Sequence, residues 1–127
     1  MNHAVIYEGN TLGDLLKYES PNLYSREAAT VGAGQHLALG TVVSRDAGTG
    51  KLYPLRLVSE TDFSPPAGVL ATDTDARLAD RDDALLIARH AIVASQALIW
   101  PAELTQEQRT LAIEQLAQLG ILVRQSA

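Results

Sequence analysis

The sequence predicts a mainly β fold: a small β-rich barrel or clip with one C-terminal helix, preceded by an extended N-terminal arm. Three observations support this class. Short runs of aliphatic residues recur between glycine-rich turns from residue 28 onward. One stretch near the C-terminus has the periodicity of an amphipathic helix. The residues before position 28 are interrupted by glycine and proline, so they cannot build a core of their own.

The extended arm is predicted over residues 1–27, ahead of a domain that covers residues 28–127. The apolar residues at its start favour a strand, yet no other β-type run lies near enough in the chain to form a hairpin with them. Glycine and proline then deny the segment a continuous helix or strand. Such a segment becomes ordered by lying on something else. Its candidate contact residues are the apolar ones: Ala4, Val5, Ile6, Tyr7 and Leu12.

The predicted strands of the domain follow one another with turns between them. They cover residues 29–31, 35–43, 52–58, 69–71, 84–89, 91–93 and 121–123. The sequence Asp-Ala-Gly-Thr-Gly at residues 46–50 is typical of a hairpin turn. His90 stands between two of the runs without glycine or proline, so those runs are either two strands or one bent strand.

The long helix is predicted to begin after Thr105 and to end before Gly120. Thr105 and Gln108 have the spacing of a capping box, in which each side chain binds the backbone N–H of the other residue. Leu111, Ile113 and Leu116 then line one broad face. A glycine just past a helix often adopts the positive φ that ends it. This helix is expected to pack on the strands.

The composition indicates one ordinary globular domain and argues against several kinds of partner. The 127 residues are 46% hydrophobic and 20% charged, which suits a single core. A net charge of −5 disfavours a nucleic-acid partner, which usually needs a clustered basic face. The sequence has no cysteine, no membrane-spanning apolar run and no signal-peptide pattern at its start. A soluble intracellular protein that binds neither nucleic acid nor membrane is therefore expected.

Three local patterns suggest chemistry, and each lacks what that chemistry requires. Residues 48–51, Gly-Thr-Gly-Lys, have neither the first glycine of a phosphate loop nor a following helix. The acidic run over residues 73–83 lacks the glycine and the final glutamate of a calcium loop, so a solvated loop is expected. His3, His36 and His90 are too far apart for a local metal motif. We therefore expect no catalytic residue, no metal and no cofactor, and a protein that is not an enzyme.

The single tryptophan, Trp100, precedes Pro101 at the junction between the last central strand and the helix. A tryptophan supplies a large apolar area and is also enriched in protein interfaces. Two interpretations remain open on this evidence. Trp100 anchors the helix in the core, or Trp100 and Pro101 form part of a subunit interface.

Segments spread over nearly the whole chain give it a family resemblance. They are residues 8–14 (EGNTLGD), 25–27 (SRE), 34–43 (GQHLALGTVV), 50–54 (GKLYP), 67–71 (AGVLA), 87–89 (IAR), 100–101 (WP) and 119–124 (LGILVR). In this order and spacing, the chain resembles the head decoration proteins of tailed bacteriophages, the group typified by the lambda decoration protein D. Residues 21–24 depart from the pattern, because relatives tend to be glycine-rich and polar there.

The resemblance implies a non-enzymatic capsid component with a fold of the β-clip type. Members of the group form homotrimers on the outer surface of the expanded phage head, at its three-fold positions. They bind neighbouring subunits of the major capsid protein there and cement the shell. The implied location is the outside of the virion capsid, after synthesis in the cytoplasm of the bacterial host. The arm would become ordered on the shell, which makes its apolar residues candidates for capsid binding.

Two functions of other classes remain as alternatives. A small-ligand-binding β-clip module needs a pocket with convergent polar groups, for which the acidic run is the one candidate in the sequence. A deoxynucleotide hydrolase of similar fold needs carboxylates, magnesium and a glycine-rich phosphate loop, and the motifs above do not supply them. A stable trimer in solution favours the capsid protein, whereas a monomer that binds metabolites favours the module.

Overall fold

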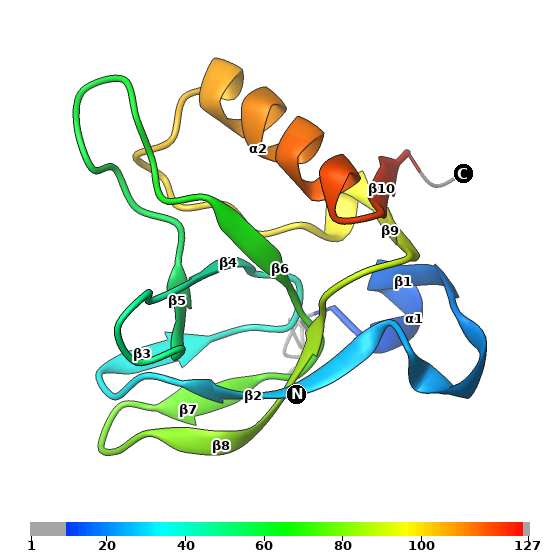
Figure 1. Cartoon of the computed structure of the whole chain (residues 1–127), viewed down its shortest axis with the longest axis horizontal. Helices are drawn as coiled ribbons and strands as arrows, with labels where there is room; N and C mark the ends of the chain where they lie inside the picture. Colours follow the sequence, from blue (N-terminus) through cyan, green and yellow to red (C-terminus); the bar gives the residue numbers. More distant parts are fainter. Residues whose placement is uncertain (1–9, 126–127) are drawn as a thin grey trace, which may run out of the picture.

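The computed structural model describes residues 10–125 of the chain (Figure 1). Its elements alternate short strands with turns until one long helix near the C-terminus. In order they are α1 (Leu12–Leu15), β1 (Leu16–Glu19), the 3-10 turn η1 (Pro21–Leu23), β2 (Arg26–Val31), β3 (Gln35–Leu37), β4 (Val42–Arg45), β5 (Leu52–Pro54), β6 (Pro66–Leu70), β7 (Thr74–Ala76), β8 (Arg81–Ile87), β9 (Ala91–Ala94), the 3-10 turn η2 (Ser95–Ala97), α2 (Gln106–Gln118) and β10 (Ile121–Arg124). The prediction of a mainly β fold with one long C-terminal helix is confirmed.

The centre of the fold is a closed barrel in which the strands run in the order β2-β5-β4-β6-β8. Most neighbours pair antiparallel, but β2 and β5 run parallel and pair at Val31 and Leu52. The small β3–β7 sheet flanks one end of the barrel (Figure 1). The buried side chains of these strands form one apolar cluster: Ala29, Val31, Leu37, Val43, Leu52, Leu70, Ala76, Ala84 and Leu86.

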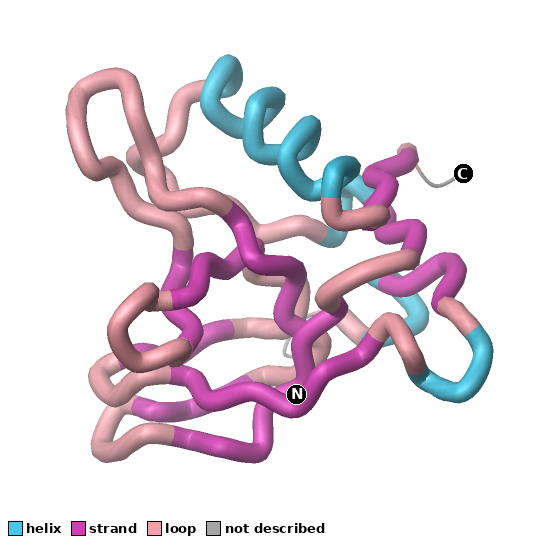
Figure 2. Tube along the Cα trace, in the orientation of Figure 1, coloured by secondary structure: helices cyan, strands magenta, loops and turns pink. Residues whose placement is uncertain are grey.

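A second sheet and the long helix build the other half of the molecule. Strand β9 lies between β1, which is antiparallel to it, and β10, which is parallel. Helix α2 packs against β10 and β6, and Figure 2 shows it crossing one side of the strands. A second and larger apolar cluster lies between this sheet, the helix and the barrel, and it includes Leu15, Val69, Val93, Leu116 and Ile121.

Local sequence signals correctly predict several of these boundaries. Residues 46–50 form the turn between β4 and β5, closed by a 2.8 Å hydrogen bond from the Asp46 N–H to the Lys51 carbonyl. Thr105 and Gln108 form the expected capping box at the start of α2. Gly120 has a φ of 83°, as the end of that helix requires.

The structure corrects the predicted arm at residues 10–27, because these residues form α1 and β1 and pack on the domain. Thr11 and Asp14 form a capping box that starts α1, and the side chain of Leu15 is fully buried in the larger cluster. Strand β1 then pairs with β9, for instance Leu16 with Val93. The partner strand lies far along the chain, so local periodicity cannot indicate the pairing. Residues 1–9, which include the rest of the predicted arm, lie outside the described residues.

Two further differences concern the acidic run and the segment around His90. The run contains strand β7, which pairs with β3 and places Thr74 and Ala76 in the interior. His90 has a φ of 47° and separates β8 and β9, which belong to different sheets, so the alternative with two strands is correct. Among residues 10–125, no helix is long and apolar enough to cross a membrane.

The burial of Leu15 gives a direct test of whether residues after position 10 belong to the domain. The substitution Leu15→Ala should lower the free energy of unfolding by about 2–5 kcal/mol, because it leaves a cavity in the larger cluster. Leu78→Ala is the matched control, since Leu78 is 99% exposed. Urea unfolding curves measure both variants. An L15A protein that unfolds with the wild-type midpoint would contradict the placement of α1.

Candidate functional site

Asn10 is the first residue that the structure describes; we call it the arm root, and its side chain is held in place on the domain. The Asn10 side-chain amide donates a 2.8 Å hydrogen bond to the carbonyl of Ala97 in η2. Gly40 lies close to the same carbonyl, because a Cβ at position 40 would come within 2.3 Å of it. The capping box of α1 follows at once. The arm root is therefore a fixed point on the domain.

Of the predicted capsid-binding residues, the structure describes one. Ala4, Val5, Ile6 and Tyr7 lie outside the described residues. Leu12 is half-buried and packs against the larger apolar cluster of its own domain. A role for any of these residues in binding remains a prediction.

Trp100 and Pro101, the predicted subunit contact, lie close to the arm root. Both are half-buried, and the Trp100 side chain packs against the larger cluster. The preceding residue, Ile99, donates a 2.9 Å hydrogen bond to the carbonyl of Gly40, the glycine that also adjoins Asn10. The structure thus brings the arm root and the tryptophan segment together. It supports the role of Trp100 as a core anchor and leaves part of the ring open to a neighbour.

An exposed apolar surface on β1 and the β1–β2 connection does not follow from the sequence pattern. We call it the aromatic surface; it consists of Tyr18, Leu23 and Tyr24, whose side chains are 53%, 58% and 55% exposed. Leu23 has a φ of 59°, and Asn22 before it has a φ of 61°. A leucine rarely adopts this left-handed conformation, which costs about 1–2 kcal/mol. The backbone therefore presents an apolar side chain to solvent at a cost in stability, a combination that is typical of binding surfaces.

Hydrogen bonds and ion pairs hold the aromatic surface rigidly on the barrel. Arg26 binds both carboxylate oxygens of Glu19 at 2.8 Å, which joins the two ends of the connection. Arg89 donates a 2.8 Å hydrogen bond to the Tyr24 carbonyl, and its guanidinium lies 5.2 Å from the centre of the Tyr24 ring. The Ser25 hydroxyl donates to the carbonyl of His90 at 2.7 Å. The surface is therefore preformed.

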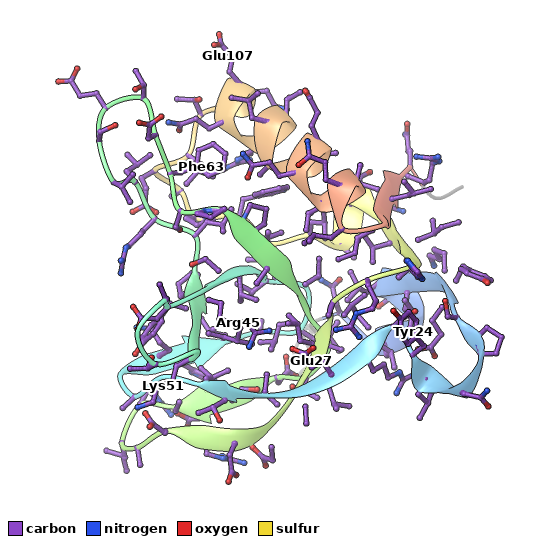
Figure 3. The ribbon with its side chains drawn as sticks, in the orientation of Figure 1. Tyr24, Glu27, Arg45, Lys51, Phe63 and Glu107 are labelled. Atoms are coloured by element: carbon purple, nitrogen blue, oxygen red, sulfur yellow. The ribbon has the colours of Figure 1, made fainter. Side chains whose placement is uncertain are left out.

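Glu27 connects this support to the wall of the barrel. Its carboxylate accepts from Arg89 at 2.6 Å and from Arg45 at 2.7 Å, and Figure 3 shows Glu27 and Arg45 side by side. Arg45 lies on β4 and Glu27 on β2, and β5 comes between these strands in the barrel. Because β5 pairs with β2 only at Val31 and Leu52, the Arg45 side chain reaches Glu27 past the paired part of β5. Burial raises the pKa of Glu27, but the hydrogen bond from Arg89 and the charge of Arg45 outweigh it and lower the pKa below its ordinary value.

The acidic run shows paired charges. Arg77 binds Asp75 at 2.8 Å, and Arg81 binds Asp83 at 2.6 Å. The Arg77 guanidinium holds the pKa of the Asp75 carboxyl well below its usual range. A hollow of about 510 Å³ adjoins these pairs at the β7–β8 connection, and Leu78 is among its lining residues. Among residues 10–125, no group of three or more potential ligands could hold a metal ion.

These features describe a small β-barrel domain whose exposed apolar residues suit contacts with other proteins. A search with known families agrees with this class. Residues 5–121 match the family described as bacteriophage lambda head decoration protein D, so the chain belongs to that family. It is a structural protein that decorates the outer surface of a phage head. A comparison with curated protein sequences found no match.

Trp100 can be tested by substitution with alanine. We expect Trp100→Ala to lower the free energy of unfolding by about 2–3 kcal/mol, because a half-buried ring loses fewer contacts than a fully buried one, which costs roughly 3–5 kcal/mol. If the ring also contacts a second subunit, the melting temperature of the variant will depend more steeply on protein concentration than that of the wild type. Melting curves at two concentrations measure both effects. A variant that melts like the wild type at both would contradict both roles.

The lowered pKa of Glu27 predicts sensitivity to acid. A group whose pKa falls on folding adds stability above its unfolded pKa, near 4.3, and that stability is lost as the pH falls through the folded value. We expect Glu27→Gln to lose about 1 kcal/mol at pH 6, because the pair is partly exposed, and to match the wild type near pH 2–3. Glu114→Gln on the exposed part of α2 is the control. Equal losses at both pH values would contradict an electrostatic role.

Proposed function

We propose that this protein cements the expanded phage head as a homotrimer. Three copies sit on the outer surface of the shell at its three-fold positions, and each copy binds the major capsid protein through its N-terminal arm. Membership of the decoration family supports binding to a phage head. The observation that carries the finer proposal is the arm root: a fixed hydrogen bond at Asn10 follows a short apolar sequence at residues 4–7.

The arm has the chemistry for adding a strand to the edge of a capsid sheet. Main-chain hydrogen bonds supply affinity in this mode, and alternate apolar side chains supply selectivity. Ordering each residue of an arm costs about 1–2 kcal/mol of backbone entropy. Burial of Val5, Ile6 and Tyr7, at about 25 cal/mol per Å² of apolar area, offsets that cost. The anchored root helps as well, because residues from Asn10 onward are already ordered.

Attachment of a trimer does not require a strong single contact. When one arm of a trimer binds, the other two arms are held near their own sites. Their binding then depends on this high effective concentration and no longer on the concentration of free protein in solution. A linked set of weak contacts then dissociates slowly. Such contacts would reinforce the shell because each trimer joins several capsid subunits.

Deletion of residues 1–9 tests the arm. A longer deletion that removes α1 and β1 would also remove Leu15 from the core, so its effect on binding would be confounded by unfolding. We expect the shortened protein to keep its unfolding midpoint and its mass in solution, and to lose co-sedimentation with undecorated expanded heads. The double substitution Val5→Asp and Ile6→Asp should act in the same way with the full length retained.

The control is Leu78→Asp, at an exposed position on the β7–β8 connection; this variant should co-sediment like the wild type. Decoration by the shortened protein at wild-type levels would refute the role of the arm. Loss of folding on deletion of residues 1–9 would refute its independence from the domain. Light scattering of the wild type tests the trimer separately, against a mass of three times 13.6 kDa.

A further inference from the structure

The connection between β5 and β6 carries a second exposed apolar surface. It leaves the barrel as a long loop that stands clear of the strands (Figure 2). Val58 is 60% exposed and Leu57 is 38% exposed. Glu60 and Asp62 lie beside them, and we call these four residues the loop surface.

The loop is held by its own hydrogen bonds. The Val58 N–H donates to the Asp62 carbonyl at 3.0 Å, and the Ser64 N–H donates to the Arg56 carbonyl at 2.8 Å. Leu57 and Phe63 form a β-bridge across the loop. The loop surface is therefore a preformed projection, and docking it does not require the ordering of a free chain.

The loop surface is acidic. Glu60 and Asp62 have no basic partner within ion-pair distance among the described residues, and neither has Glu107 at the start of the neighbouring helix (Figure 3). Hydrogen bonds from Thr49 lower the pKa of Asp46 on the β4–β5 turn, and the charge of Arg56, where the loop begins, adds to this effect. The tip of the projection thus combines exposed apolar side chains with unpaired negative charge.

The surroundings of the aromatic surface are basic. Lys17 on β1 and Arg124 on β10 have no carboxylate partner within ion-pair distance in the part of the chain that the structure describes. Arg45 and Arg89 share the one carboxylate of Glu27, which leaves a further positive charge. This excess of positive charge is local, because the whole chain has a net charge of −5.

A hollow beside the aromatic surface offers space for a projection. Its volume is about 320 Å³, and its lining includes Tyr18, His90, Ile92 and Leu122. Tyr18, Ile92 and Leu122 are register partners across β1, β9 and β10. They form an apolar row on the outer face of that sheet.

We infer that the loop surface of one copy docks against the aromatic surface of a second copy of this chain. The two surfaces have opposite charge, and each exposes apolar side chains. Figure 1 shows the β5–β6 loop and the β1–β2 connection on opposite sides of the molecule, so they do not meet within one chain. A second copy carries the complementary surface by construction, whereas any other partner would need to match it independently.

This inference rests on the proposed homotrimer and names the contact that builds it. The contact is head-to-tail, since it joins different surfaces of the two copies. Contacts of this type close into a ring when the rotation between copies fits, and a rotation of 120° gives three. Every loop surface and every aromatic surface is then covered.

Two variants test the contact by mixing. The loop variant carries Val58→Lys and Glu60→Lys, and the aromatic variant carries Tyr18→Glu and Leu23→Glu. All four positions are exposed, and Tyr24 is kept because its ring contacts Arg89 and His90. We expect each variant alone to be monomeric on light scattering, with a mass of 13.6 kDa. An equimolar mixture should give a one-to-one pair, because the intact loop surface of the aromatic variant docks on the intact aromatic surface of the loop variant. No trimer should form, because the pair leaves only the two altered surfaces uncovered.

Controls separate assembly from folding. Circular dichroism and urea midpoints should match the wild type for both variants, and Leu78→Lys should leave the mass of the assembly unchanged. If either double variant is destabilised, the single substitutions Glu60→Lys and Lys17→Glu repeat the test. Each should weaken assembly at least tenfold, measured as the concentration at which half of the protein dissociates.

The outcomes distinguish this inference from the proposed function. Trimers of both variants, with a trimeric wild type, would overturn the head-to-tail contact and leave the proposed trimer standing. Trimeric variants that fail to co-sediment with heads would also overturn it, and would show that these surfaces bind the capsid protein instead. A monomeric wild type would overturn both the trimer and the contact. Monomeric variants whose mixture forms no pair would show that the two surfaces do not meet each other.

Discussion

The larger apolar cluster is the contact on which the rest of the molecule depends. It contains side chains from the barrel, from the β1-β9-β10 sheet and from α2, so it joins two sheets that share no backbone hydrogen bonds. Its members are aliphatic, and none of its fully buried residues is aromatic. Leu15 adds the N-terminal turn to the same cluster. Removing one part would therefore expose apolar surface on the others, which couples the arm root to the stability of the domain.

That coupling matters for a protein that decorates a shell. The arm root, the Trp100 segment and the aromatic surface all lie on elements that pack against this cluster or pair with β9. Their relative positions are set before the protein meets a partner, so little conformational entropy remains to be lost on binding. The barrel serves as a rigid frame for its exposed edges and loops.

Local chemistry explains which parts could be predicted from sequence. Helix α2 has both caps in its sequence, Thr105 with Gln108 and then Gly120, so its bounds follow from short-range rules. Strand β1 pairs with residues 91–93, which lie far along the chain. Local sequence rules do not reveal this partner, so they predict an extended arm for the segment. The aromatic surface does not follow from local sequence for the same reason: Arg89, which holds the Tyr24 carbonyl, lies far along the chain.

The position of the single tryptophan makes the protein its own optical reporter. Trp100 is half-buried beside the arm root, and the chain contains no second indole to obscure its emission. Any event that covers or uncovers this ring changes the polarity around it, and the fluorescence maximum shifts accordingly. In unlabelled protein, Trp100 emission can thus report in real time on events beside the arm root.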